Sequence, residues 1–366
     1  MPNPVTFEFQ NLSYQLDNLD KEAFRLIPKS SGVFRVLDLN GNILVLEKTH
    51  DLSQRLEPFF SSHNEDSRAL DLRKVTGQID YCTTDSPMET SYLLYLERRR
   101  LFPKSYKKMR TFPFFHLLKI NRRQRFPRIY ATRQIKGGVD YFGPFSTRSE
   151  LEKLKATLER TFKIRPCRYN IRGDDPYPDC MYFQMKTCSK PCNGDISREV
   201  YLNDIDRVIA FIEGKDSSIK DPLLVQIQEL SEETRFEEAD QIRRQLERFE
   251  NARKDHRNSY LNLLKFNFVA VMDSGCQRKR KIAFIRAGLI QSVEEYSLEE
   301  ITENLCDAMC KYFKNHATIL DRDRQYDEFC LVSNFITNPI RSVRLTFVED
   351  PKATSAQIID NLTIEN

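Results

Sequence analysis

The stretch SGVFRVLDLNGNILVL, residues 31–46, decides the fold of the first part of the chain. Residues 31–37 are rich in β-branched and other apolar side chains, residues 38–42 contain the Asn-Gly signal of a turn, and residues 43–46 are apolar again. This order predicts a β-hairpin. A helix is expected to follow Asp51.

The clearest helix start in the sequence is Ser86. Its hydroxyl can cap a helix, Pro87 suits the first helical position, and Glu89 stands three residues after the cap. The helix is predicted to run to about residue 101, before Pro103.

The rest of the chain alternates strand-like and helical patterns. Residues 221–252 have the apolar spacing of two amphipathic helices with charged outer faces. The polar tail after Asp350 is expected to fray. The other predicted elements are strands within 114–148, helices at 149–162 and 200–212, strands at 268–272, 282–286 and 341–348, and a helix at 298–313.

The length of 366 residues is too great for one ordinary core and predicts several modules. The fold class expected is α+β and multidomain. The predicted modules are a small α/β domain at 26–112, a basic and aromatic β-rich extension with a helix at 113–165, a cysteine-rich loop segment with its following helix at 166–220, a helical hairpin at 221–256 and a small C-terminal α/β domain at 258–350.

Apolar runs are short throughout the sequence. The run at residues 266–272 is far below the roughly 20 residues that a membrane helix needs, and the N-terminus lacks the pattern of a signal peptide. We therefore expect no membrane association and a cytoplasmic location. The net charge of +4 is small for this length, so the distribution of charge is more informative than its sum.

One stretch is strongly basic. Between Arg98 and Lys136 there are fourteen Lys or Arg residues and no acid, interleaved with Phe and Tyr. Cations displace counterions from phosphates and aromatic rings stack on unpaired bases, so the stretch predicts nucleic-acid binding. The alternative is a solvated basic face with its aromatic residues in the core. The candidate DNA contacts are Arg98, Arg99, Lys104, Lys107, Lys108, Arg110, Arg122, Arg123 and Arg125.

Four of the nine cysteines fall within one short segment. They are Cys167, Cys180, Cys188 and Cys192, spaced C-x12-C-x7-C-x3-C. Because an intracellular chain keeps its thiols reduced, a local quartet indicates a metal site before it indicates disulfides. Four thiolates suit either tetrahedral zinc or a four-iron cluster, and spacing alone does not decide between them.

Three motifs in the same order resemble the UvrC family over residues 26–250. The first is similar to a GIY-YIG nuclease frame, with Gly32-Val33-Phe34 and Val45-Leu46-Glu47 in place of the two tripeptides, followed by Lys48, Leu52 and Arg55. The second is the cysteine segment, which ends in CSKPCNG at residues 188–194. The third, RFEEADQIR at residues 235–243, is similar to the UVR helical hairpin.

The resemblance implies a damaged nuclease site. Such nucleases use a magnesium or manganese ion held by a glutamate, a tyrosine hydroxyl near the attacking water and an arginine on the phosphate. Arg55 is retained, but Phe34 and Val45 lack a hydroxyl and Glu47 replaces a glycine. Without gaps, the metal glutamate falls on Leu94; a slip of one turn would place it on Glu97 instead, which spacing to Pro103 disfavours.

The resemblance also implies a cofactor and a partner. It favours a 4Fe-4S cluster on the cysteine quartet, with zinc as the alternative. It implies that the hairpin docks on a UvrB-like protein through Phe236, Ala239, Ile242 and Leu246; the alternative is a hairpin that packs on its own domain.

Three functions compete on these grounds. The first is a UvrC-like DNA-binding protein of nucleotide excision repair whose GIY-YIG domain is catalytically impaired. The second is a metal-dependent endonuclease that makes a single incision, with Glu97 or Glu47 holding the ion. The third is a protein-interaction scaffold without a DNA role. The last hundred residues are too few for the second nuclease and helix-hairpin-helix motifs of full-length UvrC, so two-cut excision is not expected.

Overall fold

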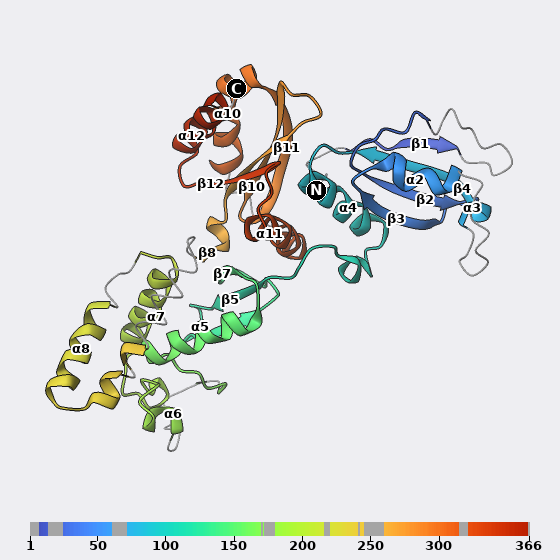
Figure 1. Ribbon diagram of the computed structural model, residues 1–366. Coiled ribbons are helices and arrows are strands. Elements are labelled where there is room, and N and C mark those ends of the chain that lie inside the picture. Colours follow the sequence, from blue (N-terminus) through green and yellow to red (C-terminus); the bar gives the residue numbers. More distant parts are fainter. Residues whose placement is uncertain are drawn as a thin grey trace. The chain divides into compact units, whose positions relative to one another are not determined.

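The computed structural model (Figure 1) describes residues 7–13, 25–60, 72–169, 171, 180–215, 220–240, 242–244, 260–314 and 321–364. Within them the chain folds into several small antiparallel sheets with helices, which confirms the predicted α+β multidomain class. The chain forms two compact units. Unit 1 contains Met1–Pro113, Asn267–Thr318 and Leu331–Asn366, and unit 2 contains Phe114–Phe266 and Ile319–Cys330.

The first sheet of unit 1 contains the predicted hairpin. Its order is β1-β4-β2-β3, and each neighbouring pair is antiparallel. Gly41 adopts a φ of 82° in the turn, where a side chain would be strained. Its strands and helices are β1 (Gln10–Ser13), β2 (Gly32–Asp38), β3 (Ile43–Thr49), α2 (Leu52–Phe60), α3 (Leu72–Val75), β4 (Thr76–Thr83), α4 (Pro87–Leu101) and the 3-10 helix η2 (Tyr106–Met109).

The two faces of this sheet carry separate apolar cores. Side chains alternate along a strand, so Phe34 packs with Leu52 and Leu56 of α2, whereas Val33 packs with Leu93 and Leu94 of α4. α4 begins as predicted, because the Ser86 hydroxyl accepts the backbone N–H of Glu89 at 3.1 Å.

Unit 2 is built on a sheet of order β6-β5-β7-β8, whose last strand comes from much later in the sequence. The aromatic rings of Phe145 and Tyr260 stack with centroids 3.8 Å apart where the chain returns to this sheet. The elements are β5 (His116–Ile120), β6 (Ile129–Thr132), β7 (Asp140–Phe145), α5 (Arg148–Thr161), α6 (Met181–Gln184), η3 (Pro191–Asn193), α7 (Arg198–Ile212), α8 (Lys220–Glu232), β8 (Leu261–Asn262) and η4 (Leu263–Lys265).

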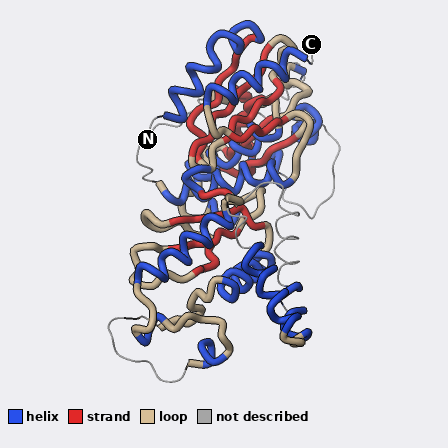
Figure 2. The backbone as a smooth tube through the Cα atoms, turned by 90° about the vertical axis from the view of Figure 1, so that its left-hand side faces the viewer, coloured by secondary structure: helices blue, strands red, loops and turns tan. Residues whose placement is uncertain are grey.

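The second sheet of unit 1 has the order β11-β10-β9-β12, and α10 and α12 pack against it (Figures 1 and 2). The expected frayed tail is wrong: α12 is helical, and Ile358 and Leu362 are buried against α10. Its apolar stripe is narrow, so the sequence looks polar although one face is covered. The elements are β9 (Phe268–Asp273), β10 (Lys279–Arg286), β11 (Leu289–Ser297), α10 (Leu298–Lys314), α11 (Arg322–Thr337, which runs from unit 2 into unit 1), β12 (Val343–Phe347) and α12 (Pro351–Ile364).

Candidate functional site

The α2 face of the first sheet holds Phe34, Glu47 and Arg55. Phe34 is fully buried and pairs across the β2–β3 ladder with Glu47. An Nη atom of Arg55 lies 2.7 Å from a carboxylate oxygen of Glu47, and both side chains are about half exposed. Val36 pairs with Val45, so no hydroxyl stands at that register position either. Arg55 of α2 is therefore paired with Glu47 of β3.

The α4 face holds Leu94 and Glu97. Leu94 is 1% exposed and part of the apolar core. The Glu97 carboxylate accepts hydrogen bonds from Arg35 at 3.3 Å and from Arg100 at 2.7 Å. Arg35 also donates to Asp80 at 2.6 Å. Glu97 is thus held by two guanidinium groups.

The structure does not bring Arg55 and Glu97 together. Glu97 binds Arg35, and Arg35 pairs across the ladder with Leu46, a member of the α4-face core. Arg55 binds Glu47, the next residue along β3, which points to the other face. The sheet therefore separates the two predicted catalytic residues. Among the described residues, no group of three or more His, Cys, Asp or Glu side chains is arranged to hold a metal ion.

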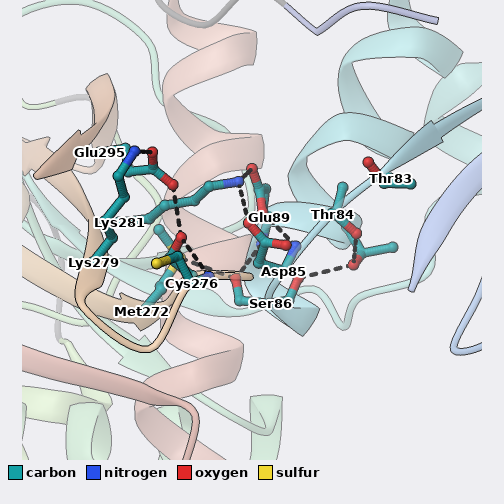
Figure 3. Close-up of polar contacts among 12 residues, drawn as sticks. Thr83, Thr84, Asp85, Ser86, Glu89, Met272, Cys276, Lys279, Lys281 and Glu295 are labelled. Carbon is teal, nitrogen blue, oxygen red and sulfur yellow. Dashed lines mark hydrogen bonds and ion pairs between the residues drawn. The ribbon is translucent and has the colours of Figure 1, made fainter. Parts of the chain in front are cut away.

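A charged cluster at the start of α4 escaped the sequence-based prediction (Figure 3). Lys281 Nζ lies 2.8 Å from an Asp85 carboxylate oxygen and 2.7 Å from one of Glu89. Glu89 is 6% exposed, and its other oxygen accepts the Asp85 backbone N–H at 2.8 Å. The Ser86 hydroxyl donates to the Met272 sulfur at 3.1 Å.

The electrostatics of this cluster favour the charged lysine. Burial opposes the charge of Lys281, but Glu89 and Asp85 outweigh it, so the pKa of Lys281 is raised. Gly275 approaches the same place closely, because a Cβ there would lie 3.0 Å from an Asp85 oxygen. No sequence pattern indicates a contact between residues 192 positions apart, which is why the cluster was missed.

The basic stretch is divided in the structure. Its first part lies in unit 1 and its second part in unit 2. Arg98 is partly buried and donates to the Leu46 carbonyl at 3.2 Å and to the Met109 carbonyl, Arg99 donates to the Tyr95 hydroxyl, and Arg110 lies over the Phe112 ring. These three arginines have structural contacts. The exposed candidates are Lys104, Lys107, Lys108, Arg122, Arg123 and Arg125.

Most aromatic residues of this stretch are in the cores. Tyr106, Phe112, Phe115 and Phe126 are buried, and Phe114 is 39% exposed. Their burial agrees with the alternative prediction for this stretch, in which the aromatic side chains pack in the core and the cations are solvated. Any contact with DNA here therefore depends on Lys and Arg. The guanidinium of Arg122 lies 3.2 Å from Asp140 and 3.0 Å from Asp206, so these two acids partly neutralise its charge.

The four candidate cysteines lie within electrostatic reach of one another. Burial raises the pKa of the Cys188 thiol to about 11, the backbone N–H of Lys190 opposes this shift, and Cys167, Cys180 and Cys192 add to it. That N–H donates to the Cys188 sulfur at 3.4 Å. The donor set suits a thiolate-bound metal or cluster in its chemistry, although the described side chains do not form a closed ligand group.

The hairpin is described in part. α8 is helical, as are residues 236–240 and 242–244, and Leu246 lies outside the described residues. Ala239 is 3% exposed and Ile242 packs against the core of unit 2, whereas Phe236 is 66% exposed. Only Phe236 among these three is therefore open to a partner. None of the described helices is long and apolar enough to cross a membrane.

Comparisons with known proteins point to one family. A family model described as the UvrC/Cho excinuclease, middle domain, matches residues 115–211. The UvrABC system protein C of Clostridium novyi (strain NT) is 29% identical over 298 residues, covering 80% of this chain and 48% of that protein. That of Thermoanaerobacter sp. (strain X514) is 25% identical over 353 residues, covering 90% of this chain and 57% of that protein.

These matches run along most of the chain. This chain spans about half the length of the curated relatives it matches. No solved structure matches it.

Proposed function

Because this chain belongs to the UvrC family, we propose that it binds DNA in nucleotide excision repair and that its GIY-YIG-like domain does not cut. The relatives are named as components of the UvrABC system, which supports the repair role. Repair of DNA would place the protein in the cytoplasm.

The observation that carries the loss of cutting is the environment of Glu97. A divalent ion needs an unpaired carboxylate oxygen, whereas this carboxylate accepts hydrogen bonds from Arg35 and Arg100. The Glu97 side chain is 12% exposed, and an ion could bind it only if both guanidinium groups moved away. Phe34 adds a second loss, because its buried ring cannot align or deprotonate water.

A nicking assay tests this proposal. The purified chain, incubated with magnesium or manganese and damaged duplex, should give no more nicks than a denatured sample, with and without UvrA- and UvrB-type partners. Metal and general-base contributions are each worth orders of magnitude in rate, so the loss of both leaves background activity.

The competing candidate is a single-incision endonuclease. The exposed Glu47–Arg55 pair favours it, because an acid and a phosphate-binding cation then stand side by side on one face. Nicking that is abolished by Glu47→Gln would locate the metal there. Nicking that is abolished by Glu97→Gln would place it on α4, and either result would replace an inactive domain with an active one.

We further propose that Cys167, Cys180, Cys188 and Cys192 hold a 4Fe-4S cluster. The mutual influence of their thiols and the N–H donated to Cys188 support this ligand set. Such a cluster would cross-link a segment whose own helices are a turn or less long. Anaerobically purified protein should contain about four iron and four sulfide ions per chain. Stoichiometric zinc without sulfide would contradict the proposal.

The partner proposed is a UvrB-like protein that docks on the hairpin. The exposed ring of Phe236 supports a contact, because two short amphipathic helices leave apolar surface uncovered on their own. Because Ala239 is buried and Ile242 packs on the core of unit 2, Phe236 is the one of these three side chains that is open to such a contact.

A further inference from the structure

The cysteine segment carries a concentration of exposed apolar side chains. Of the thirteen large apolar residues exposed in the described part of the chain, four lie between residues 169 and 185. Tyr169, Met181, Phe183 and Met185 are 68%, 61%, 46% and 52% exposed. Side chains of this size lose burial energy when they face water, so such a concentration marks a surface for a ligand.

The backbone beneath these side chains is folded back on itself. The N–H of Lys186 donates to the Phe183 carbonyl at 2.8 Å, which closes the turn after α6. The N–H of Ser189 donates to the Lys163 carbonyl at 3.0 Å and so ties the segment to the end of α5. The apolar side chains are therefore displayed by a preformed turn, and little order has to be gained on binding.

Cations flank the apolar side chains. Lys190 Nζ lies 4.9 Å from the centroid of the Phe183 ring, and Lys186 and Arg168 of the same segment are exposed. Between residues 163 and 190 the sequence has six Lys or Arg and three Asp. A mainly apolar protein partner would leave these cations without a match. A strand of nucleic acid offers phosphates to the cations and base faces to the aromatic rings.

We propose that the exposed side chains Tyr169, Met181, Phe183 and Met185, together with Lys190, bind an unpaired stretch of DNA. The rings stack on bases and the lysine contacts a phosphate. In an intact duplex the base faces are hidden by their neighbours, so these side chains select DNA that has been opened. The inference rests on the proposed DNA-binding function and adds the form of DNA recognised.

Fluorescence anisotropy with the full chain tests this selectivity. The probes are one labelled duplex and the same duplex with a short central bubble of unpaired bases. The wild-type protein should bind the bubble more tightly. The double variant Tyr169→Ala, Phe183→Ala should bind it at least about thirtyfold more weakly, since it loses stacking on about two bases, while its affinity for the duplex changes by less than about twofold.

Leu264→Ala is the matched control. Leu264 is 61% exposed and lies in the same unit, outside the cysteine segment, so its loss should leave both affinities unchanged. Circular dichroism and the iron content should match the wild type in every variant, because the substituted side chains are exposed. Should the double variant retain its affinity for the bubble while the wild type binds both probes, these side chains serve a protein partner instead and only this inference fails. A wild-type protein that binds neither probe would overturn the proposed DNA function as well.

Discussion

A single lysine compensates two acids at the start of α4. Lys281→Met keeps most of the side chain but leaves Glu89 buried without its cation. We expect the free energy of unfolding to fall by about 2–3 kcal/mol, less than for a fully buried pair because Asp85 is partly exposed. Urea unfolding of the full chain measures this change in the free energy of unfolding.

The control for Lys281 is its neighbour Lys279. Lys279 lies 2.8 Å from Glu295, but both side chains are more than a third exposed, so Lys279→Met should have no measurable effect. Adding Glu89→Gln to Lys281→Met should restore part of the loss, since it removes the buried charge. Equal urea midpoints for Lys281→Met and the wild type would show that water or another cation compensates Glu89.

Glu159 should make the stability of unit 2 depend on pH. Burial raises the pKa of its carboxyl from 4.5 to about 7, although Lys155, 3.4 Å away, opposes the shift. Because the folded state binds the proton more tightly, the stability contributed by Glu159 is complete below about pH 4.5 and is lost as the pH rises to about 7. Glu159→Gln should therefore stabilise the protein at pH 8 by about 1–3 kcal/mol and leave it unchanged at pH 4.5. Thermal melts across this range decide the matter, with the more exposed Glu152→Gln as the control; a gain that is the same at every pH would exclude titration of Glu159.

At the scale of the element, the loop between β5 and β6 carries three exposed cations of unit 2. Replacing Arg122, Arg123 and Arg125 by Ala should weaken DNA binding and flatten its dependence on salt, because each lost phosphate contact lowers the slope. The pairs of Arg122 with Asp140 and Asp206 predict that Arg123 and Arg125 carry more of the effect.

A second triple variant distinguishes the effect of this loop on DNA binding from the effect of the net charge. Arg148, Lys153 and Arg160 lie exposed on α5 and are not among the proposed DNA contacts. Their replacement by Ala removes the same formal charge and should change the salt slope less. Equal slopes for the two triple variants would mean that DNA senses only the net charge of the protein.

Features of the fold that depend on neighbouring residues could be predicted from the sequence, and features that depend on distant residues could not. The cap of α4 by Ser86 and the turn at Gly41 rest on a few neighbouring residues, and both were confirmed. The strand β8 and the pairing of Lys281 with Glu89 depend on residues far along the chain, so no local pattern could show them.

The candidate site shows the same contrast between local and distant contacts. The spacing of Cys167 to Cys192 predicted a metal site, and this stays a prediction, because the described side chains form no closed ligand group. The substitutions at Phe34 and Leu94 could also be seen directly in the sequence. The pairing of Glu97 with Arg100 follows helix spacing, whereas its pairing with Arg35 could not be seen, because Arg35 approaches α4 from β2.

At the scale of the whole molecule, the exposed ring of Phe236 makes the hairpin a candidate contact for a partner. Phe236→Asp should weaken a complex with a UvrB-like protein by at least about tenfold, since it places a charge in an apolar contact. Leu39→Asp is the control, because Leu39 is 80% exposed in a turn of unit 1. Isothermal titration with the purified partner measures both, and equal affinities would move the contact away from Phe236.

The return of the chain to unit 2 at Leu261–Asn262 has a consequence for synthesis. On the ribosome, the edge of β7 stays unpaired until β8 has emerged, more than a hundred residues after β7 itself. Glu89 likewise has no cation until Lys281 is made. A nascent chain that stalls inside the hairpin therefore presents an open strand edge, which favours aggregation and degradation over release of a working fragment.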